Sequence, residues 1–210
     1  MSSASTENPG EDQAPPATLR LFFALWPPTE AASELGRVAG EAASRYGGRP
    51  IRPAAIHLTL AFLGEVPESS LPVLKAAAQT VRANPFELVF DRLGYWPRNH
   101  LLWAGCEASP AALDGLYRGL QLALAGAGFC GDHESRRFKP HITLVRNVSR
   151  NRCPDRMTDT LPIDPLGWPC SQFVLVRSQL SAEGSSYQIV GEFPLAGLSA
   201  EIAPDAGCPG

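Results

Sequence analysis

Two four-residue words, HLTL at residues 57–60 and HITL at residues 141–144, are nearly identical, and each has the alternation expected of a strand. Successive side chains of an extended chain point to opposite faces. His57 and Thr59 therefore share one face of their strand, and His141 and Thr143 share one face of theirs. Each word presents an imidazole and a hydroxyl together, and the fold has to accommodate both words.

Chance accounts poorly for the pair of words. The sequence holds 4 histidines and eight threonines in 210 residues. Two histidines with a threonine two positions later are then a coincidence on the order of one per cent. An isolated H-x-T is typical of a strand with an exposed polar face, whereas the repeat indicates a shared function.

The order of the expected elements also repeats. A strand, a helix and an H-x-T strand follow one another before residue 65 and again, more loosely, between about 100 and 148. His141 lies 84 residues after His57, so each half of the chain can supply one word to a shared cleft. We expect an α+β fold of two pseudo-symmetric lobes, whose antiparallel sheets form a central cleft and whose helices lie outside.

Hydrophobic periodicity and the positions of turn residues predict the individual strands and helices. The expected strands are 20–26, 57–63, 86–95, 101–106, 141–148, 172–181 and 187–194, and the expected helices are 29–45, 67–83 and 110–125. Residues 1–18 are rich in Ser, Pro, Ala and acids and have no periodicity. We expect a disordered tail at 1–18, one folded domain over 19–198 and a flexible tail at 199–210.

Bulk composition narrows the class of protein. The 44% of apolar residues is ordinary for a globular domain. The longest apolar run near the start is too short to span a bilayer, and the segment before it lacks the features of a signal peptide, so we expect no membrane association. The five cysteines form no C-x-x-C pair, which argues against disulfides or thiolate zinc and favours the cytoplasm.

Charge is unevenly distributed along the chain. The net charge of −3 argues against a protein that follows long nucleic acids. Residues 134–156 nevertheless hold seven basic residues against two acids, and they surround the second word. Two explanations of this basic cluster stay open: it is a solvated loop, or it forms the positively charged entrance to a binding site for a ligand that carries phosphate.

Two imidazoles and two hydroxyls suit in-line displacement at phosphorus, in which the attacking and leaving oxygens lie on opposite sides. One histidine would deprotonate water and the other would protonate the departing ribose oxygen, while Thr59 and Thr143 hold the phosphate oxygens. The ordinary histidine pKa of about 6.5 fits both roles. The residues alone do not assign the acid and the base, and this chemistry requires neither a metal nor a cofactor.

The sequence resembles a known family over about residues 19–198. The segments HLTLAFLG, RFKPHITLVR, RLFFALWPP and LVRSQLSAEGSSYQIVGEFPL look like those of the two-histidine phosphoesterases, and within them of the bacterial RNA 2′,3′-cyclic phosphodiesterases, also called the 2′–5′ RNA ligase family. The resemblance implies that His57 is the proton donor and His141 the proton acceptor, and that Thr59 and Thr143 bind the phosphate. It also implies hydrolysis of 2′,3′-cyclic phosphate ends of RNA to 2′-phosphomonoesters, and we expect a monomer.

Three further residues beside the second word are candidates for substrate binding. Arg146 follows Thr143 on the same strand, although strict alternation puts its side chain on the face of Leu144. Phe138 and Lys139 precede His141 and are expected to line the entrance to the cleft.

Other functions remain open at this stage. The same groups could catalyse the reverse reaction, ligation of a cyclic phosphate end to a 5′-hydroxyl. A non-catalytic module could bind nucleotides or RNA ends in the same cleft. Asp132, His133 and Glu134 could join His141 in a metal site, but we prefer a loop there, because arginines beside these acids offset their charge.

Overall fold

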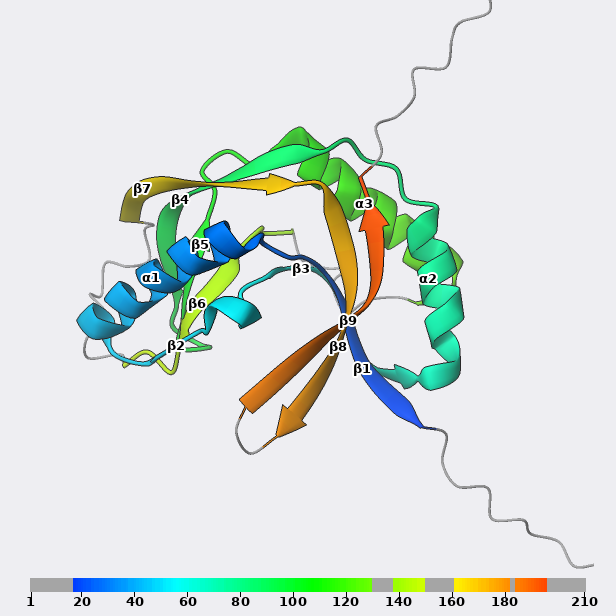
Figure 1. Cartoon of the computed structure of the whole chain (residues 1–210), viewed down its shortest axis with the longest axis horizontal. Helices are drawn as coiled ribbons and strands as arrows, with labels where there is room; N and C mark the ends of the chain where they lie inside the picture. Colours follow the sequence, from blue (N-terminus) through cyan, green and yellow to red (C-terminus); the bar gives the residue numbers. More distant parts are fainter. Residues whose placement is uncertain (1–16, 130–137, 150–160, 182–183, 196–210) are drawn as a thin grey trace, which may run out of the picture.

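The computed structural model describes residues 17–129, 138–149, 161–181 and 184–195, which form one large antiparallel sheet with three α-helices (Figure 1). The strands are β1 (Thr18–Leu25), β2 (Arg49–Pro50), β3 (Leu58–Pro67), β4 (Phe86–Trp96), β5 (Leu101–Gly105), β6 (Ile142–Arg146), β7 (Leu161–Cys170), β8 (Gln172–Ser181) and β9 (Gly184–Pro194). The helices are α1 (Thr29–Tyr46), α2 (Leu71–Gln79) and α3 (Ala111–Gly126), with short 3₁₀ turns η1 (Pro53–Ala55) and η2 (Glu68–Ser70).

The sheet is built from two matching halves. Its strand order is β7-β4-β5-β6-β3-β1-β8-β9, and β2 pairs with β6. The two H-x-T strands, β6 and β3, meet in the middle, where Leu58 pairs with Ile142. Outward from this pair, β5 corresponds to β1, β4 to β8 and β7 to β9. The structure therefore confirms the α+β class and the two pseudo-symmetric lobes.

The central strand β1 is covered on both faces. Leu21, Phe23 and Leu25 are fully buried in the main hydrophobic core. Phe22 and Ala24 point the other way and form a second, smaller cluster with valines of β8. Burial on both faces explains why this segment of the sequence is apolar almost throughout.

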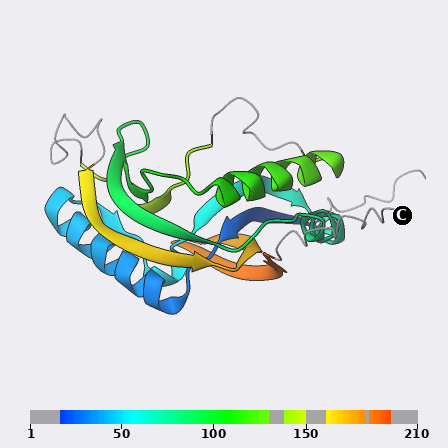
Figure 2. The ribbon, with the colours of Figure 1, turned by 90° about the horizontal axis from the view of Figure 1, so that it is seen from above.

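Each lobe is covered by a helix that comes from the other lobe. Helix α1 leaves β1 and packs on β6 and β7, whereas α3 leaves β5 and lies against β3 and α2 (Figures 1 and 2). The buried face of α3 consists of Leu113, Leu116, Leu120 and Leu124, as the helical spacing predicts. Gln121 of α3 donates a hydrogen bond to the Leu60 carbonyl in β3 at 3.3 Å. This exchange ties the two halves of the sheet together.

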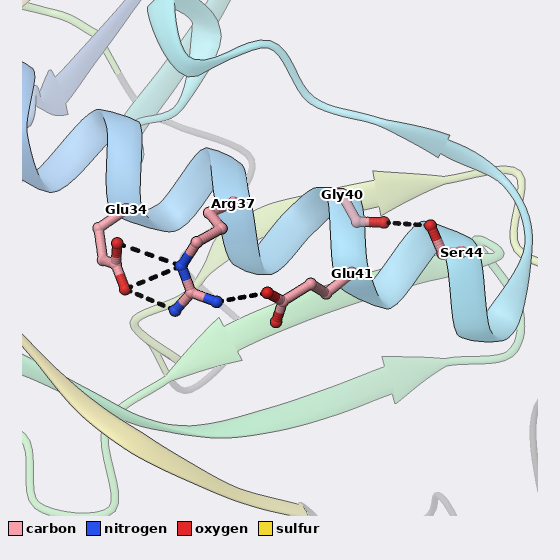
Figure 3. A network of polar contacts seen from close by, with 5 residues as sticks. All are labelled: Glu34, Arg37, Gly40, Glu41 and Ser44. Atoms are coloured by element: carbon pink, nitrogen blue, oxygen red, sulfur yellow. Dashed lines mark hydrogen bonds and ion pairs between the residues drawn. The ribbon is translucent and has the colours of Figure 1, made fainter.

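The exposed face of α1 carries a small charged network (Figure 3). Arg37 lies between Glu34 and Glu41 and pairs with both, one turn away in each direction. Ser44 donates a hydrogen bond to the Gly40 carbonyl at 3.0 Å. These contacts lie in solvent, where water and salt screen them, so we expect each to add little to the stability of the helix.

Two strands are absent from the expectation, the two-residue β2 and the longer β7. β7 holds Pro162, Pro165 and Pro169, which argue against a strand within a sheet because proline cannot donate to the ladder. Among the strands that the structure describes, β7 pairs only with β4 and forms an edge, where one side of the backbone needs no partner strand. The other elements lie close to their predicted bounds, except that α2 is shorter, β3 ends four residues later and β9 begins three residues earlier than expected.

Some predictions fall outside the described part of the chain. The predicted tails at 1–18 and 199–210 lie almost entirely there, although β1 already begins at Thr18. The same holds for Asp132, His133 and Glu134 and for most of the basic cluster, of which only Lys139 and Arg146 are described. Within the described ranges, none of the helices has both the length and the hydrophobicity needed to cross a membrane.

Candidate active site

The two H-x-T words meet at the centre of the sheet. His57 and His141 immediately precede β3 and β6, the strands that pair through Leu58 and Ile142. A cavity of about 90 Å³ opens between them; it is lined by His57, Thr59, His141 and Thr143, together with Ile51, Ala55, Arg146 and Tyr187. At about 30 Å³ for each water molecule, this space holds roughly three waters, or one phosphoryl group. The structure thus brings the four expected residues to a single cavity.

The same backbone contact orients both imidazoles. Nδ1 of His57 donates a hydrogen bond to the Ala55 carbonyl at 2.8 Å, and Nδ1 of His141 donates to the Lys139 carbonyl at 2.8 Å. Because a carbonyl only accepts, each Nδ1 carries the proton. Nε2 of each ring is then the nitrogen that can take up or release a proton during a reaction.

Burial makes both histidines hard to protonate. Desolvation lowers the pKa of His57 to about 4, against the opposing effect of the Ala55 carbonyl, and the nearby charges of Arg146 and His141 lower it further. Desolvation also lowers the pKa of His141, against the opposing effect of the Lys139 carbonyl. Both rings are neutral at pH 7 in the unliganded protein, which suits a base better than an acid.

Aromatic rings surround His57. The Trp26 indole stacks on its imidazole, with ring centroids 5.3 Å apart and planes inclined by 5°. Phe22 and Tyr187 contact the ring at centroid distances of 4.9 Å and 5.3 Å. These rings come from β1, the turn after it and β9, so they hold the imidazole and exclude water from it.

His141 lies against a different aromatic pair. The Trp96 ring meets it edge to face at a centroid distance of 4.4 Å, and Trp103 supports Trp96 at 5.4 Å. Trp103 fits over Gly94 of the neighbouring strand, where an added Cβ would come within 2.1 Å of the indole. Gly94 is therefore required for the packing that supports His141.

A β-bulge decides the position of Arg146. Trp103 pairs with Thr143 and Leu102 with Val145, so Leu144 is an extra residue in β6. Leu144 and Val145 are both fully buried, which breaks the alternation between faces. Arg146 consequently returns to the face of Thr143 and lines the cavity, in contrast to the expectation from strict alternation.

The other two candidates beside the second word do not reach this cavity. Phe138 stacks on Tyr117 of α3, with centroids 4.0 Å apart and planes inclined by 8°. The exposed Lys139 contributes its backbone carbonyl to His141, and its side chain is not among the groups that line the cavity. Sequence reasoning also missed Tyr187, Ile51 and Ala55, although the quoted closing hairpin contains Tyr187.

No cluster of three or more histidine, cysteine or acidic side chains suited to a metal ion occurs within the ranges that the structure describes. Cys106 and Cys170, which lie in these ranges, are free thiols.

A two-lobed antiparallel sheet that joins two H-x-T strands defines the class of two-histidine phosphoesterases. The family model described as LigT-like phosphoesterase matches residues 25–103. An RNA 2′,3′-cyclic phosphodiesterase of Thermus thermophilus is 32% identical over 186 residues, which are 85% of this chain and 91% of that protein. The chain belongs to this family of LigT-like phosphoesterases.

A second relative and a solved structure are also similar to this chain. An Escherichia coli protein of the same name is 31% identical over 170 residues, covering 80% of this chain and 92% of its own. The crystal structure of E. coli LigT complexed with 3′-AMP superposes with a TM-score of 0.72 at 29% identity, covering 85% of this chain and 99% of that one. The similarity therefore extends over both lobes.

Proposed function

We propose that this protein is a phosphodiesterase that hydrolyses the 2′,3′-cyclic phosphate ends of RNA to 2′-phosphomonoesters. The observation that carries the proposal is the cavity in which both H-x-T pairs meet, because it offers two proton-transfer groups and two hydroxyls around a space for one phosphoryl group. Its relatives from T. thermophilus and E. coli are named for this activity, which supports the proposal.

Each histidine has one step in the reaction. Nε2 of His141 accepts a proton from a water molecule as the water oxygen attacks phosphorus. The bond between phosphorus and the ribose 3′-oxygen breaks, and Nε2 of His57 donates its proton to that oxygen. The product carries a 2′-phosphate and a 3′-hydroxyl, and the two histidines exchange their protonation states.

Three side chains stabilise the charge on phosphorus. The hydroxyls of Thr59 and Thr143 donate hydrogen bonds to the non-bridging oxygens, one from each lobe. Arg146, which the bulge directs to the cavity, offsets the charge that grows on these oxygens in the transition state. These groups supply the electrostatic stabilisation without a metal ion or another cofactor.

Substrate binding prepares His57 for its role as the acid. Burial is the largest cause of its pKa of about 4, and the charge of Arg146 is the next of the causes that lower it. An anionic phosphate bound between Arg146 and His57 opposes this charge and raises the pKa of His57. Proton uptake by His57 therefore accompanies binding, whereas His141 stays neutral and acts as the base.

The chain acts on RNA ends in the cytoplasm as a monomer. The five scattered cysteines, which include no C-x-x-C pair, support a reducing compartment.

Turnover of a defined RNA end tests the function. The purified protein, with a chelator present, should convert an oligonucleotide with a 2′,3′-cyclic phosphate to the 2′-phosphate, with a bell-shaped pH profile. His57→Ala and His141→Ala should each lower kcat by at least about a thousandfold, because the two groups act as a unit. Full activity in either variant, or activity lost to the chelator, contradicts the proposal. Joined oligonucleotides in place of a 2′-phosphate would identify a ligase.

A second substrate distinguishes the acid from the base. The p-nitrophenolate of an aryl phosphodiester leaves without a proton, so it does not need a general acid. The variant that lacks the acid should retain much of its activity on this substrate, whereas the variant that lacks the base should not. We expect His57→Ala to be the rescued variant, and rescue of His141→Ala would reverse the roles.

A further inference from the structure

A second, larger cavity continues outward from the one between the histidines. It has a volume of about 330 Å³ and shares His57, Thr59, Arg146 and Tyr187 with the inner cavity. Its other walls come from β1, β2, β3 and the β8–β9 hairpin: Arg20, Phe22, Arg49, Phe62, Ser178, Leu180 and Ser185. A ligand with its phosphate in the inner cavity therefore has space to extend in this direction.

Positive charge dominates the outer cavity. Arg20, Arg49 and Arg146 line it, and none of its lining residues in the described part of the chain is acidic. Within the described part of the chain, none of the three forms an ion pair with a carboxylate. The hydroxyls of Ser178 and Ser185 add two groups able to donate to an anion.

Two of these arginines face each other across neighbouring strands. Arg49 of β2 is the direct register partner of Arg146 of β6. Like charges at such a pair destabilise a sheet unless something opposes them. A bound anion opposes both charges at once, so this pairing indicates a ligand site rather than a contribution to the fold.

Arg20 is held in place by an aromatic ring. Its guanidinium lies 4.8 Å from the centroid of Phe62, although Glu65 is its register partner on β3. The contact with Phe62 orients the side chain without neutralising its charge. Arg20 from one lobe and Arg49 from the other thus present two cations at the same cavity.

We infer that the outer cavity binds the phosphate on the 5′ side of the terminal nucleoside, whose 2′,3′-cyclic phosphate occupies the inner cavity. In RNA this group is the phosphodiester to the preceding nucleotide, and in a mononucleotide it is a 5′-phosphate. Arg20 and Arg49 pair with its oxygens, so the protein selects RNA ends over nucleosides that carry a cyclic phosphate alone. This inference rests on the proposed function for the identity of the inner ligand.

Three substrates test the inference: adenosine 2′,3′-cyclic phosphate, the same compound with a 5′-phosphate, and the dinucleotide ending in the same cyclic phosphate. We expect kcat/KM to be about tenfold or more higher for the second and third than for the first, because charge-assisted hydrogen bonds add to binding. The advantage should shrink with added salt. Equal kcat/KM for all three overturns the inference while leaving the proposed function intact.

Variants of Arg20 and Arg49 test whether these two side chains cause the preference for a 5′-phosphate. Arg49→Gln, at an exposed position, and Arg20→Gln should each reduce the ratio of kcat/KM between the 5′-phosphorylated and unphosphorylated substrates severalfold, toward one. Arg45→Gln is the matched control, since Arg45 is an exposed arginine of α1 whose guanidinium lies over Tyr46 rather than at the cavity. A ratio that stays unchanged in both Arg20 and Arg49 variants overturns the inference.

Binding of ligands that are not turned over tests the outer cavity independently of the proposed catalysis. Calorimetry should show tighter binding of adenosine 2′,5′-bisphosphate than of adenosine 2′-phosphate, and Arg49→Gln should remove most of the difference. If no cyclic phosphate is turned over but this preference exists, the proposed catalysis fails and the anion site stands. If turnover is normal and both compounds bind alike, the anion site fails.

Discussion

The two halves of the candidate site share their backbone but differ in their surroundings. In both halves a carbonyl two residues before the histidine, from Ala55 or Lys139, accepts the Nδ1 hydrogen bond at 2.8 Å. The ring of His57 is stacked under Trp26, whereas that of His141 meets the edge of Trp96. The backbone contact thus orients both rings in the same way, whereas the aromatic side chains around the two rings differ.

The bulge is also repeated, with a different outcome. In β3, Thr59 pairs with Ala24 and Ala61 with Phe23, so Leu60 is the extra residue, as Leu144 is in β6. The residue five positions after the histidine then returns to the face of the site: Phe62 in one half and Arg146 in the other. One geometry therefore supplies a charged group to the inner cavity and an aromatic support to the outer one.

We expect the largest measurable effect in the dependence of the protein's stability on acidic pH. The unfolded chain protonates His57 near pH 6.5, whereas the folded protein does so only at about 4. The resulting stability is fully present above pH 6.5 and is lost as the pH falls toward 4, with a total of about 3 kcal/mol. Urea denaturation of the wild type between pH 7 and 4 should show this loss.

The variant His57→Gln identifies the source of the acid sensitivity. It has no group that titrates at this position, so its free energy of unfolding should fall less steeply over the same pH range. The corresponding variant His141→Gln should also flatten the curve, because the pKa of His141 is lowered too. A slope that neither variant changes would assign the loss to other groups.

Removal of Arg146 should reduce the electrostatic difference between the halves. In Arg146→Gln the pKa of His57 should rise but stay below 6.5, because burial is the larger cause of its shift. The pKa of His141 should change little, since Arg146 is not among its causes. Titration of the ring protons by NMR measures both values. We also expect kcat/KM to fall about tenfold, as one charge-assisted hydrogen bond to phosphate is lost. Equal shifts in both histidines would contradict the asymmetry.

The sequence predicted the parts of this site that depend on local pattern. Two nearly identical words with strand alternation are enough to place His57 and Thr59 on one face and His141 and Thr143 on another, and the spacing between the words is enough to predict two lobes. The position of Arg146 depends on a bulge that buries two adjacent residues, Leu144 and Val145, and strict alternation does not allow for such a bulge. The sequence alone therefore put its side chain on the wrong face.

Tertiary contacts account for the other differences. Tyr187 reaches His57 only because the β8–β9 hairpin pairs with β1, far away in the sequence. Phe138 could not be assigned to Tyr117 without knowing where α3 packs. The sequence did not predict β7, because its prolines are compatible with a strand only at the edge of a sheet. The local sequence pattern does not show which strand lies at an edge, since that depends on the strand order of the whole sheet.

The smallest effect should come from Lys139, and it tests whether backbone or side chain matters beside His141. The contact that orients His141 uses the Lys139 carbonyl, which any residue provides. The equivalent position in the other half is already an alanine, Ala55, whose carbonyl makes the same contact at the same distance. Lys139→Ala should therefore change kcat/KM by less than about twofold and leave the pKa of His141 in place, since surface substitutions seldom cost more than about 0.5 kcal/mol. A tenfold loss, comparable to that expected for Arg146→Gln, would instead mean that the ammonium group contacts the substrate.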